Sequence, residues 1–349
     1  MADKLRAAVI GTGMGRYHME AYARNPKVDL VAVCDLNGPE AQEFATKFGA
    51  ERVFTDWREM YELDLDLVSI AVPNNLHAEM TVAALERGFH VLCEKPMATK
   101  LEDARRMVET AERVGKRLMI HMSLRYQGAH QHLKSLVAKG DLGDIYLGEA
   151  RMIRRRGTPL LDFPPGGSMG RGPWFVIKEE SGGGAVMDIG VHTFDLVWWL
   201  MGCPKPVAVS GATFAALRRP EFAERKVPAD TDEHAAAFVA LEGGRRIFFE
   251  ACWASNQPDS FTVELFGTQA GARLGDGLRV LTHEGKEPRD NNVEVPDGVG
   301  LVSYDHFVEG VLDPSVELIS EGWKCLPVAQ VLDALDRSAA LGSEVVIEA

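Results

Sequence analysis

Residues 7–15 read Ala-Ala-Val-Ile-Gly-Thr-Gly-Met-Gly, an apolar run that leads directly into a glycine-rich turn. Such a turn between a strand and a helix brings backbone N–H groups against a pyrophosphate, and the helix dipole adds attraction for the anion. The dinucleotide-binding fingerprint is GxGxxG, and here the third glycine comes one residue early. A tight turn without a ligand is the alternative. The stretch predicts the following cofactor contacts: Gly11, Thr12, Gly13, Met14 and Gly15.

The first third of the chain alternates short apolar runs with segments of helical periodicity. The apolar runs cover residues 7–10, 30–34, 67–72, 90–93 and 118–121, and the helical segments cover 39–48, 77–87 and 101–114. Strands that are apolar throughout and alternate with helices are typical of a parallel sheet covered on both faces. We therefore expect a doubly wound α/β domain at residues 1–124.

The pattern changes in residues 125–349. Strand-like stretches cover 145–154, 207–214, 235–241, 245–253 and 261–266, and helical ones cover 131–138, 190–201, 304–311 and 328–341. Tight polar turns separate several of these strands, which favours hairpins. We expect a second, α+β domain with a mostly antiparallel sheet. Two hydrophilic stretches, 160–172 and 218–232, are predicted loops, and the first is a candidate cover over a site.

Asp35 follows the apolar run 30–34, at the spacing where the fingerprint places an acid that binds a ribose 2′-hydroxyl. A carboxylate at this position repels the 2′-phosphate of NADP, and residues 36–38 include no arginine or lysine to receive it. We therefore expect Asp35 to bind the ribose and NAD to be preferred to NADP. A carboxylate that only caps the turn is the alternative.

Two further strand ends carry polar residues, in the stretches 72–77 and 94–96. In open parallel sheets, ligands bind outside the carboxyl ends of the strands. Lys95 is accordingly predicted to lie near a bound nicotinamide ring. Solvated turns and an asparagine cap are the alternatives. The remaining predicted cofactor contacts at these ends are Pro73, Asn74, His77, Glu94 and Pro96.

The sharpest chemical signal is Asp188 followed by His192, after a run of three glycines. If Asp188 enters the helix, His192 lies one turn later on the same face. A carboxylate beside an imidazole raises its basicity and orients it, as removal of a hydroxyl proton requires. Asp195 is a second carboxylate within reach of His192. The alternative is a core histidine on an apolar helix.

Length and composition exclude several classes of protein. A chain of 349 residues, 46% of them hydrophobic, fits two globular domains. Its formal charge of −13 makes nucleic acid and anionic membranes poor partners. Five cysteines without a CxxC pair argue against disulfides or a zinc ribbon and favour the cytoplasm. We expect no membrane span, no signal peptide and no metal, because His130 and His132 lack further ligands at suitable spacing.

Taken together and in this order, the glycine turn, Asp35, Pro73-Asn74, Glu94-Lys95-Pro96 and the stretch 182–192 resemble one family. It is the glucose–fructose oxidoreductase / inositol dehydrogenase / rhizopine-catabolism (Gfo/Idh/MocA) family, and the resemblance is looser after residue 205. It implies an N-terminal Rossmann domain, a C-terminal domain with a large open sheet, a nicotinamide cofactor and a sugar, cyclitol or related polyol substrate. The shortened glycine turn is a departure, which leaves open which amides meet the pyrophosphate.

The resemblance also implies roles for single residues. Lys95 contacts the nicotinamide region and the reacting hydroxyl, Asp188 orients His192, and His192 takes the proton. Arg125 falls where the family binds its cofactor, and Trp174 where it binds substrate. Because family members associate through the sheet of the second domain, a homodimer or homotetramer is expected.

Four arginines at positions 151, 154, 155 and 156 form a basic cluster in an acidic chain. On a single strand, Arg154 and Arg156 share one face, while Arg151 and Arg155 share the other. An arginine that faces the substrate pairs with a carboxylate or a phosphate. We name Arg155 as a candidate substrate contact. A solvated edge strand or a set of intersubunit ion pairs is the alternative.

The sequence thus predicts an NAD-dependent dehydrogenase that oxidises a secondary hydroxyl of a sugar, a cyclitol or a sugar derivative. Two alternatives stay open. One is an enzyme that retains bound NAD and acts as a glycosidase or a sugar–sugar oxidoreductase. The other is a sensor that binds NAD or a sugar without turnover, although the proton-transfer set Lys95, Asp188 and His192 argues against it.

Overall fold

The structure is a computed structural model that describes residues 4–162 and 172–348. By its internal contacts the chain divides into two compact units. The first unit runs to His121 and also includes Val302–Leu326, and the second comprises the other described residues. Most of the predicted loop 160–172 lies outside the described residues, so its role as a cover stays a prediction.

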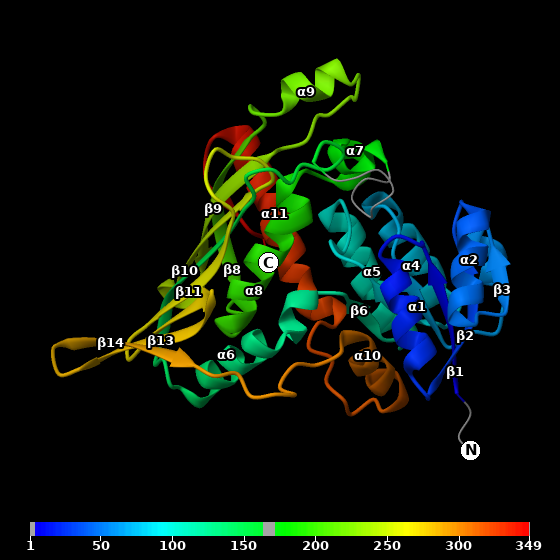
Figure 1. Cartoon of the computed structure of the whole chain (residues 1–349), viewed down its shortest axis with the longest axis horizontal. Coiled ribbons are helices and arrows are strands. Elements are labelled where there is room, and N and C mark those ends of the chain that lie inside the picture. Colours follow the sequence, from blue (N-terminus) through cyan, green and yellow to red (C-terminus); the bar gives the residue numbers. More distant parts are fainter. Residues whose placement is uncertain (1–3, 163–171, 349) are drawn as a thin grey trace. The chain divides into compact units, whose positions relative to one another are not determined.

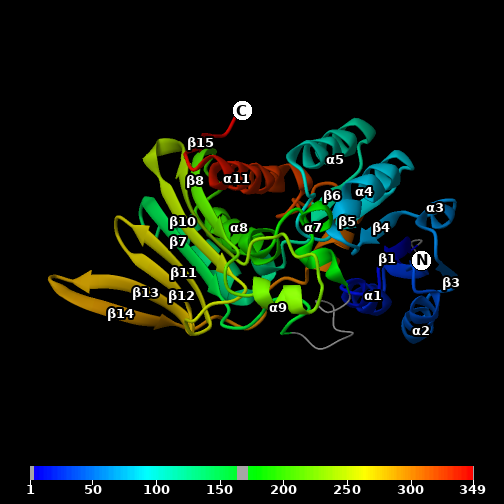
Figure 2. The same cartoon turned by 90° about the horizontal axis from the view of Figure 1, so that it is seen from above.

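The first unit is built on a parallel sheet (Figure 1). Within the described residues its six strands have the order β3-β2-β1-β4-β5-β6, and each adjacent pair is parallel. The order reverses between β1 and β4, where doubly wound sheets bind nucleotides. Figure 2 shows α4 and α5 on one side of this sheet and α1 and α2 on the other. The strands are β1 (Leu5–Ile10), β2 (Val28–Cys34), β3 (Arg52–Phe54), β4 (Leu67–Ile70), β5 (His90–Cys93) and β6 (Leu118–Ile120). The helices are α1 (Gly15–Arg24), α2 (Gly38–Phe48), α3 (Trp57–Met60), α4 (His77–Glu86), α5 (Leu101–Val114) and α10 (Ser303–Leu312).

The predicted doubly wound architecture is confirmed, and two short elements were missed. Strand β3 has three residues, none of them fully buried, so no apolar run marks it. Helix α3 has a single turn, which begins after Asp56, whose side chain accepts the Arg58 amide. Hydrophobic periodicity identifies elements only where burial extends over several residues.

The second unit is built on a larger sheet, and here too the predicted architecture is confirmed. Within the described residues, nine strands have the order β14-β13-β12-β11-β7-β10-β9-β8-β15. Strands β7 and β10 run parallel, and the other described pairs are antiparallel. The strands are β7 (Ile145–Ile153), β8 (Pro206–Phe214), β9 (His234–Leu241), β10 (Arg246–Cys252), β11 (Ser260–Gly267), β12 (Gly271–Gly275), β13 (Gly277–Glu284), β14 (Glu287–Val293) and β15 (Val345–Val346).

Helices α8 and α11 lie on the same side of this sheet (Figure 2), and α8 contacts β7 and β10 directly. The predicted helix 190–201 is confirmed as α8, which a π-helical turn at Val186–Gly190 precedes. The predicted loop 218–232 contains one short helix, α9. No described helix is both long and apolar enough to cross a membrane. The helices of this unit are α6 (Gly128–Lys139), α7 (Lys178–Ser181), α8 (Val191–Leu200), α9 (Arg219–Glu224) and α11 (Gly322–Leu341), the last of which starts in the first unit.

The segment Val302–Leu326 is tied to the end strand β6 of the first unit. The Ile120 amide donates to the Ser320 carbonyl at 2.9 Å. The Arg117 guanidinium donates to the Glu321 carboxylate at 2.7 Å and to the Gly310 carbonyl at 3.0 Å. These bonds explain why residues so late in the chain belong to the unit that contains its beginning.

Inside the second unit, Arg125 and Asp195 form a buried ion pair. Arg125 Nε lies 3.0 Å from Asp195 Oδ2, and its Nη2 lies 2.6 Å from Oδ1. The two side chains are 1% and 2% exposed, so neither charge is solvated by water. A buried charge that loses its partner destabilises the fold strongly.

We predict that Asp195→Asn lowers the free energy of unfolding by about 3–5 kcal/mol, because it leaves the Arg125 charge uncompensated. Urea unfolding followed by tryptophan fluorescence measures this change. The control is Asp336→Asn, which removes the half-exposed pair with Lys178 and should cost no more than about 1 kcal/mol. Equal effects of the two substitutions would contradict the assignment.

Candidate functional site

The glycine turn joins β1 to α1, and its three glycines have three different roles. Gly11 has a φ of +91°, and a Cβ there would lie 2.1 Å from the Ala71 carbonyl oxygen. A Cβ on Gly15 would lie 3.0 Å from a methyl group of Val9, so α1 begins in close contact with the strand. At Gly13 no described protein atom lies within 4 Å of that position. These are the roles of the fingerprint glycines, namely a tight turn, helix–strand packing and open space for a pyrophosphate.

Asp35 braces this turn. Its Oδ2 accepts the Thr12 amide at 2.7 Å and the Thr12 hydroxyl at 2.8 Å. Its Oδ1 accepts the Asn37 amide at 2.9 Å. Asp35 therefore has the turn-capping role that sequence analysis gave as the alternative to ribose binding. The contact with the ribose stays a prediction.

His77 links the two polar strand ends. Its ring nitrogens lie 2.8 Å from the Pro96 carbonyl and 3.0 Å from the Val72 carbonyl. Burial lowers the pKa of His77, so the ring is neutral near pH 7 and donates to one carbonyl at a time. Asn74 is also buried, in the single helical turn that follows Pro73. The ring thus holds together the turns that precede α4 and follow β5.

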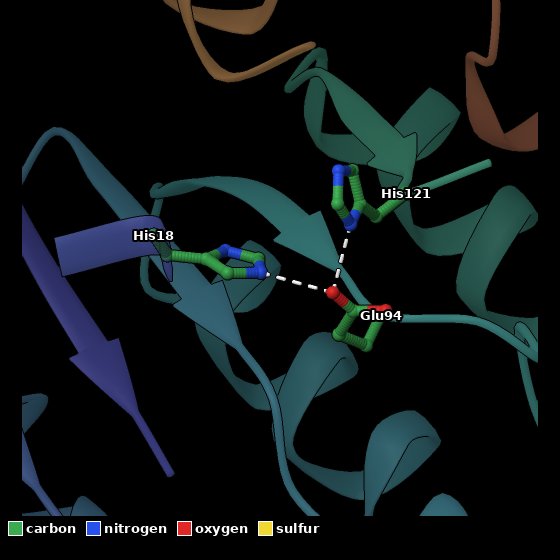
Figure 3. Close-up of side chains that lie close together, drawn as sticks. All are labelled: His18, Glu94 and His121. Carbon is green, nitrogen blue, oxygen red and sulfur yellow. Dashed lines mark hydrogen bonds and ion pairs between the residues drawn. The ribbon is translucent and has the colours of Figure 1, made fainter. Parts of the chain in front are cut away.

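Glu94 lies at the centre of a buried cluster with His18 and His121 (Figure 3). Glu94 Oε1 lies 3.0 Å from His18 Nε2 and 2.8 Å from His121 Nδ1. On its other side, His121 Nε2 lies 2.8 Å from the Ser303 hydroxyl. The Tyr304 ring packs edge-on against His18, with 4.7 Å between centroids. The cluster therefore joins α1, the end of β5, the end of β6 and the start of α10.

Glu94 carries the negative charge of this cluster. Burial alone raises the pKa of Glu94, but the charge and hydrogen bond of His121 and the hydrogen bond from His18 hold it well below its usual range. Burial lowers the pKa of His18 despite its bond to Glu94. The other oxygen of Glu94 accepts the Lys95 amide at 3.2 Å. An ionised carboxylate thus fixes the backbone directly at the lysine.

His18, Glu94 and His121 are also ligand types that divalent metals use, and one ligand atom from each lies within 4.8 Å of the others. The carboxylate oxygen already accepts hydrogen bonds from both rings, so these atoms are paired with one another. The absence of a metal stays a prediction. No sequence spacing related these three residues, because 76 residues separate His18 from Glu94.

Asp188 lies in the π-helical turn before α8, a geometry that occurs frequently at functional sites. The Trp253 indole, which is 1% exposed, donates to Asp188 Oδ2 at 2.9 Å. The preceding glycine run is held by Asp232, whose carboxylate accepts the Gly184 amide at 2.7 Å. His192 is the second residue of α8 and is partly buried.

Asp195 has a different partner from the one considered from the sequence. Its carboxylate accepts two hydrogen bonds from Arg125 and is almost fully buried. The same bonds engage the guanidinium of Arg125, whose contact with the cofactor stays a prediction. Asp188 is therefore the carboxylate that we assign to His192, and this pairing also stays a prediction.

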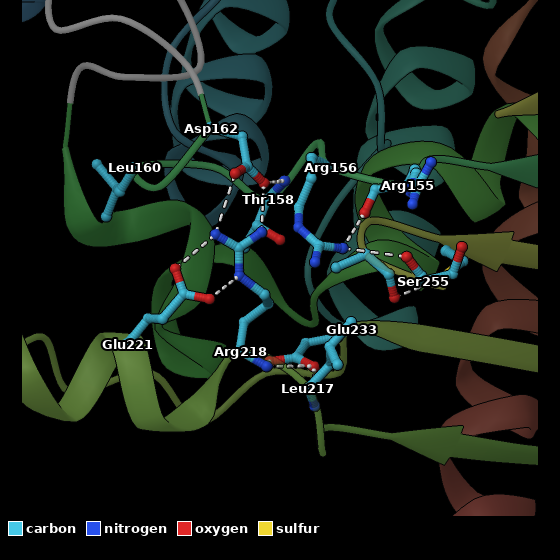
Figure 4. A network of polar contacts seen from close by, with 12 residues as sticks. Arg155, Arg156, Thr158, Leu160, Asp162, Leu217, Arg218, Glu221, Glu233 and Ser255 are labelled. Carbon is cyan, nitrogen blue, oxygen red and sulfur yellow. Dashed lines mark hydrogen bonds and ion pairs between the residues drawn. The ribbon is translucent and has the colours of Figure 1, made fainter. Parts of the chain in front are cut away.

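The arginine cluster separates into different environments. Arg154 Nη1 lies 3.9 Å from Asp188 Oδ2. Arg155 is exposed, and Figure 4 shows its side chain apart from the polar network around Arg218. The Trp174 ring stacks on Phe175 with 3.8 Å between centroids. Substrate contacts of Arg155 and Trp174 stay predictions. Sequence analysis missed the contacts of Trp253 and Arg154 with Asp188, because tertiary packing rather than local spacing brings them together.

The first unit fits a dinucleotide. The N-terminus of α1 follows an open turn, no acidic residue occupies the first turn of this helix, and Asp35 lies at the end of the neighbouring strand. A helix N-terminus without an acidic residue in its first turn favours an anionic pyrophosphate.

Comparisons with known proteins agree with this fit. A family described as "Oxidoreductase family, NAD-binding Rossmann fold" matches residues 5–122, and the "GFO/IDH/MocA C-terminal domain" matches residues 130–273. D-glucoside 3-dehydrogenase of Escherichia coli is 32% identical over 99% of this chain and 98% of its own. Levoglucosan dehydrogenase of Pseudarthrobacter phenanthrenivorans is 29% identical over 76% of this chain and 72% of its own.

Among solved structures, a levoglucosan dehydrogenase in complex with NADH and levoglucosan has a TM-score of 0.85 at 24% identity. The match covers 99% of this chain and 100% of that chain, which shows that both units have the same fold in the two proteins. The family matches and the full-length relative confirm the resemblance seen in the sequence. The chain belongs to the Gfo/Idh/MocA family of NAD-binding oxidoreductases.

Proposed function

We propose that the protein oxidises a secondary hydroxyl of a sugar, a cyclitol or a sugar derivative with NAD. The observation that carries this proposal is the Asp188 carboxylate, which Trp253 holds at 2.9 Å four residues before His192. A fixed carboxylate next to an imidazole suits removal of a hydroxyl proton. The names of two relatives, a glucoside dehydrogenase and a levoglucosan dehydrogenase, support a carbohydrate substrate.

In this reaction a carbinol loses a C–H hydride and an O–H proton and becomes a ketone. NAD, when bound, accepts the hydride. His192 takes the hydroxyl proton, while Asp188 orients the ring and stabilises the imidazolium that forms. The base must therefore be neutral before the reaction begins.

We assign to Lys95 the stabilisation of the negative charge that develops on the hydroxyl oxygen as the proton leaves. The turn that carries Lys95 is braced on both sides. The Lys95 amide donates to Glu94 at 3.2 Å, and the Pro96 carbonyl lies 2.8 Å from the His77 ring. A preorganised ammonium stabilises the transition state because little reorganisation is needed when charge appears.

We also propose a homodimer or homotetramer formed through the second unit's sheet. Phe214 and Phe238 are 54% and 46% exposed, and Phe238 pairs with Phe248 across β9 and β10. Along their strands, Phe214 and Phe238 point to the same face. Exposed aromatic side chains gathered on one sheet face are typical of an interaction surface.

A cytoplasmic location is part of the same proposal. All five cysteines lie within the described residues as thiols outside any disulfide, and four of them are buried. Free thiols persist in a reducing compartment.

We predict that His192→Ala and Lys95→Ala each lower kcat by roughly 10²–10⁴-fold, because each removes a group that acts on the reacting hydroxyl. The Kd for NADH, measured by tryptophan fluorescence, should change little. Release of NADH from a polyol panel supplies the rate and also distinguishes a dehydrogenase from an enzyme that retains its NAD. His283→Ala is the control, since this histidine is exposed on β13. Near-normal turnover of the His192 variant would contradict the assignment of His192 as the general base.

We predict that Asp35→Ser raises the ratio of kcat/KM for NADP to that for NAD by at least about 10-fold, because it removes a carboxylate that repels the 2′-phosphate. Initial rates with the two cofactors measure this ratio. Asp29→Ser is the control, an acid on the same strand whose partner is Lys4 at 2.7 Å. An unchanged ratio in the Asp35 variant would argue against a ribose contact.

We predict that Phe238→Glu reduces the oligomer to smaller species, because a charge on the shared face must be desolvated in the interface. Sedimentation velocity measures the change. Leu312→Glu is the control, a 42% exposed residue on α10. A wild-type protein that sediments as a monomer would refute the proposed assembly.

A further inference from the structure

Arg154 lies on the same side of the second unit's sheet as Asp188. Its amide donates to the Cys252 carbonyl at 2.9 Å, which continues the parallel pairing of β7 with β10. Because side chains alternate along a strand, Arg154 shares a face with Met152. Met152 packs on the buried cluster that contains Trp253, the residue that donates to Asp188.

One nitrogen of Arg154 is buried without an acceptor. Among the described residues, no hydrogen-bond partner is present for Arg154 Nη1. Asp188 Oδ2 lies 3.9 Å away, beyond hydrogen-bond distance, and it already accepts the Trp253 indole at 2.9 Å. A buried charged donor without an acceptor is costly, and a ligand that supplies an acceptor offsets this cost.

The backbone that follows Arg154 is fixed by a close approach and by an ion pair. A Cβ on Gly157 would lie 2.4 Å from Arg154 Cδ, so the glycine lets the backbone fold closely over the arginine. The following residues are clamped by Arg218, which donates to both oxygens of Asp162 at 2.7 and 3.0 Å (Figure 4). Asp162 in turn accepts the Thr158 amide at 2.8 Å. The backbone that follows Arg154 is therefore held in place.

The charge around Arg154 is positive. Arg155 and Arg156 follow it, and Arg156 donates to backbone carbonyls at 2.7 and 3.1 Å. Asp188 and Asp259 are the carboxylates that the described residues place against this segment. Three positive guanidinium groups and two negative carboxylates thus lie in this segment, which gives a local excess of positive charge in a chain whose net charge is −13. An anionic oxygen is the acceptor that this excess favours.

We propose that Arg154 binds a carboxylate of the substrate, so that the enzyme acts on a sugar acid or polyol acid in preference to its neutral counterpart. The inference rests on the proposed dehydrogenase function and names its substrate class. A carboxylate fits better than a phosphate because Asp188 lies 3.9 Å from the donor and repels the more highly charged group.

The experiment uses matched pairs that differ only in the acid, namely methyl glucuronide with methyl glucoside, glucuronate with glucose, and gluconate with glucitol. Glucose 6-phosphate is included as the phosphate arm. For each compound we would measure NADH formation and binding to the enzyme–NADH complex. In at least one pair the acid should be favoured by 10-fold or more, as expected for a charge-assisted hydrogen bond.

Arg154→Gln should abolish this preference through a 10- to 100-fold rise in the KM or Kd of the acid relative to that of its neutral partner, with the Kd for NADH little changed. Arg154→Lys, which retains the charge, should keep part of the preference. Arg289→Ala is the control, an arginine that pairs with Glu284 on the β13–β14 hairpin at 2.6 Å.

Three results would overturn the proposal: no acid is favoured in any pair, the preference survives in Arg154→Gln, or an Arg154-dependent preference is found for the phosphate alone. If neutral sugars reduce NAD in a His192-dependent reaction without this preference, only the substrate class fails. If neither acids nor neutral sugars reduce NAD, the proposed dehydrogenase function itself fails.

Discussion

A carboxylate in a protein interior must be supplied with hydrogen-bond donors, and Glu94 receives them from three separate elements. His18 of α1 and His121 after β6 bind one oxygen, while the Lys95 amide binds the other. The strand end that carries the lysine is therefore positioned by the same helix that begins at the glycine turn. Displacement of either ring removes one of these donors from a buried charge, so the positions of α1 and of the ends of β5 and β6 depend on one another.

Sequence analysis found the elements in which buried residues recur at a regular spacing along the chain. Strand β5 and helix α5 have the predicted bounds, because their apolar residues follow the spacing of a buried strand and of an amphipathic helix. Strand β14 lacks such a signal, since six of its seven residues are exposed. The membership of Val302–Leu326 in the first unit was also beyond prediction, because it depends on hydrogen bonds to β6 and on Arg117 rather than on a repeat.

In the candidate site, the sequence predicted catalytic residues, which stay predictions, and missed the contacts that support them. Asp188 and His192 are four residues apart, so a helical repeat relates them. Trp253 reaches Asp188 across 65 residues, and no spacing encodes an approach that depends on the packing of the turn Val186–Gly190 against β10. The same limit applies to Arg154, since the alternation of side chains along a strand predicted its face of the sheet but not that Asp188 lies near it. Spacing along the chain thus suggests a pairing only between residues that are close in sequence.

The late segment that completes the first unit has a consequence for the order of biosynthesis. Ser303 reaches His121 across 182 residues, and Ser320 receives the amide of Ile120. Chains leave the ribosome from the N-terminus, so β1 to β6 emerge long before these partners exist. The nucleotide-binding half must wait, incompletely closed, until residues 302–326 have been translated. The first unit therefore obtains its full set of hydrogen bonds only when nearly the whole polypeptide has been made.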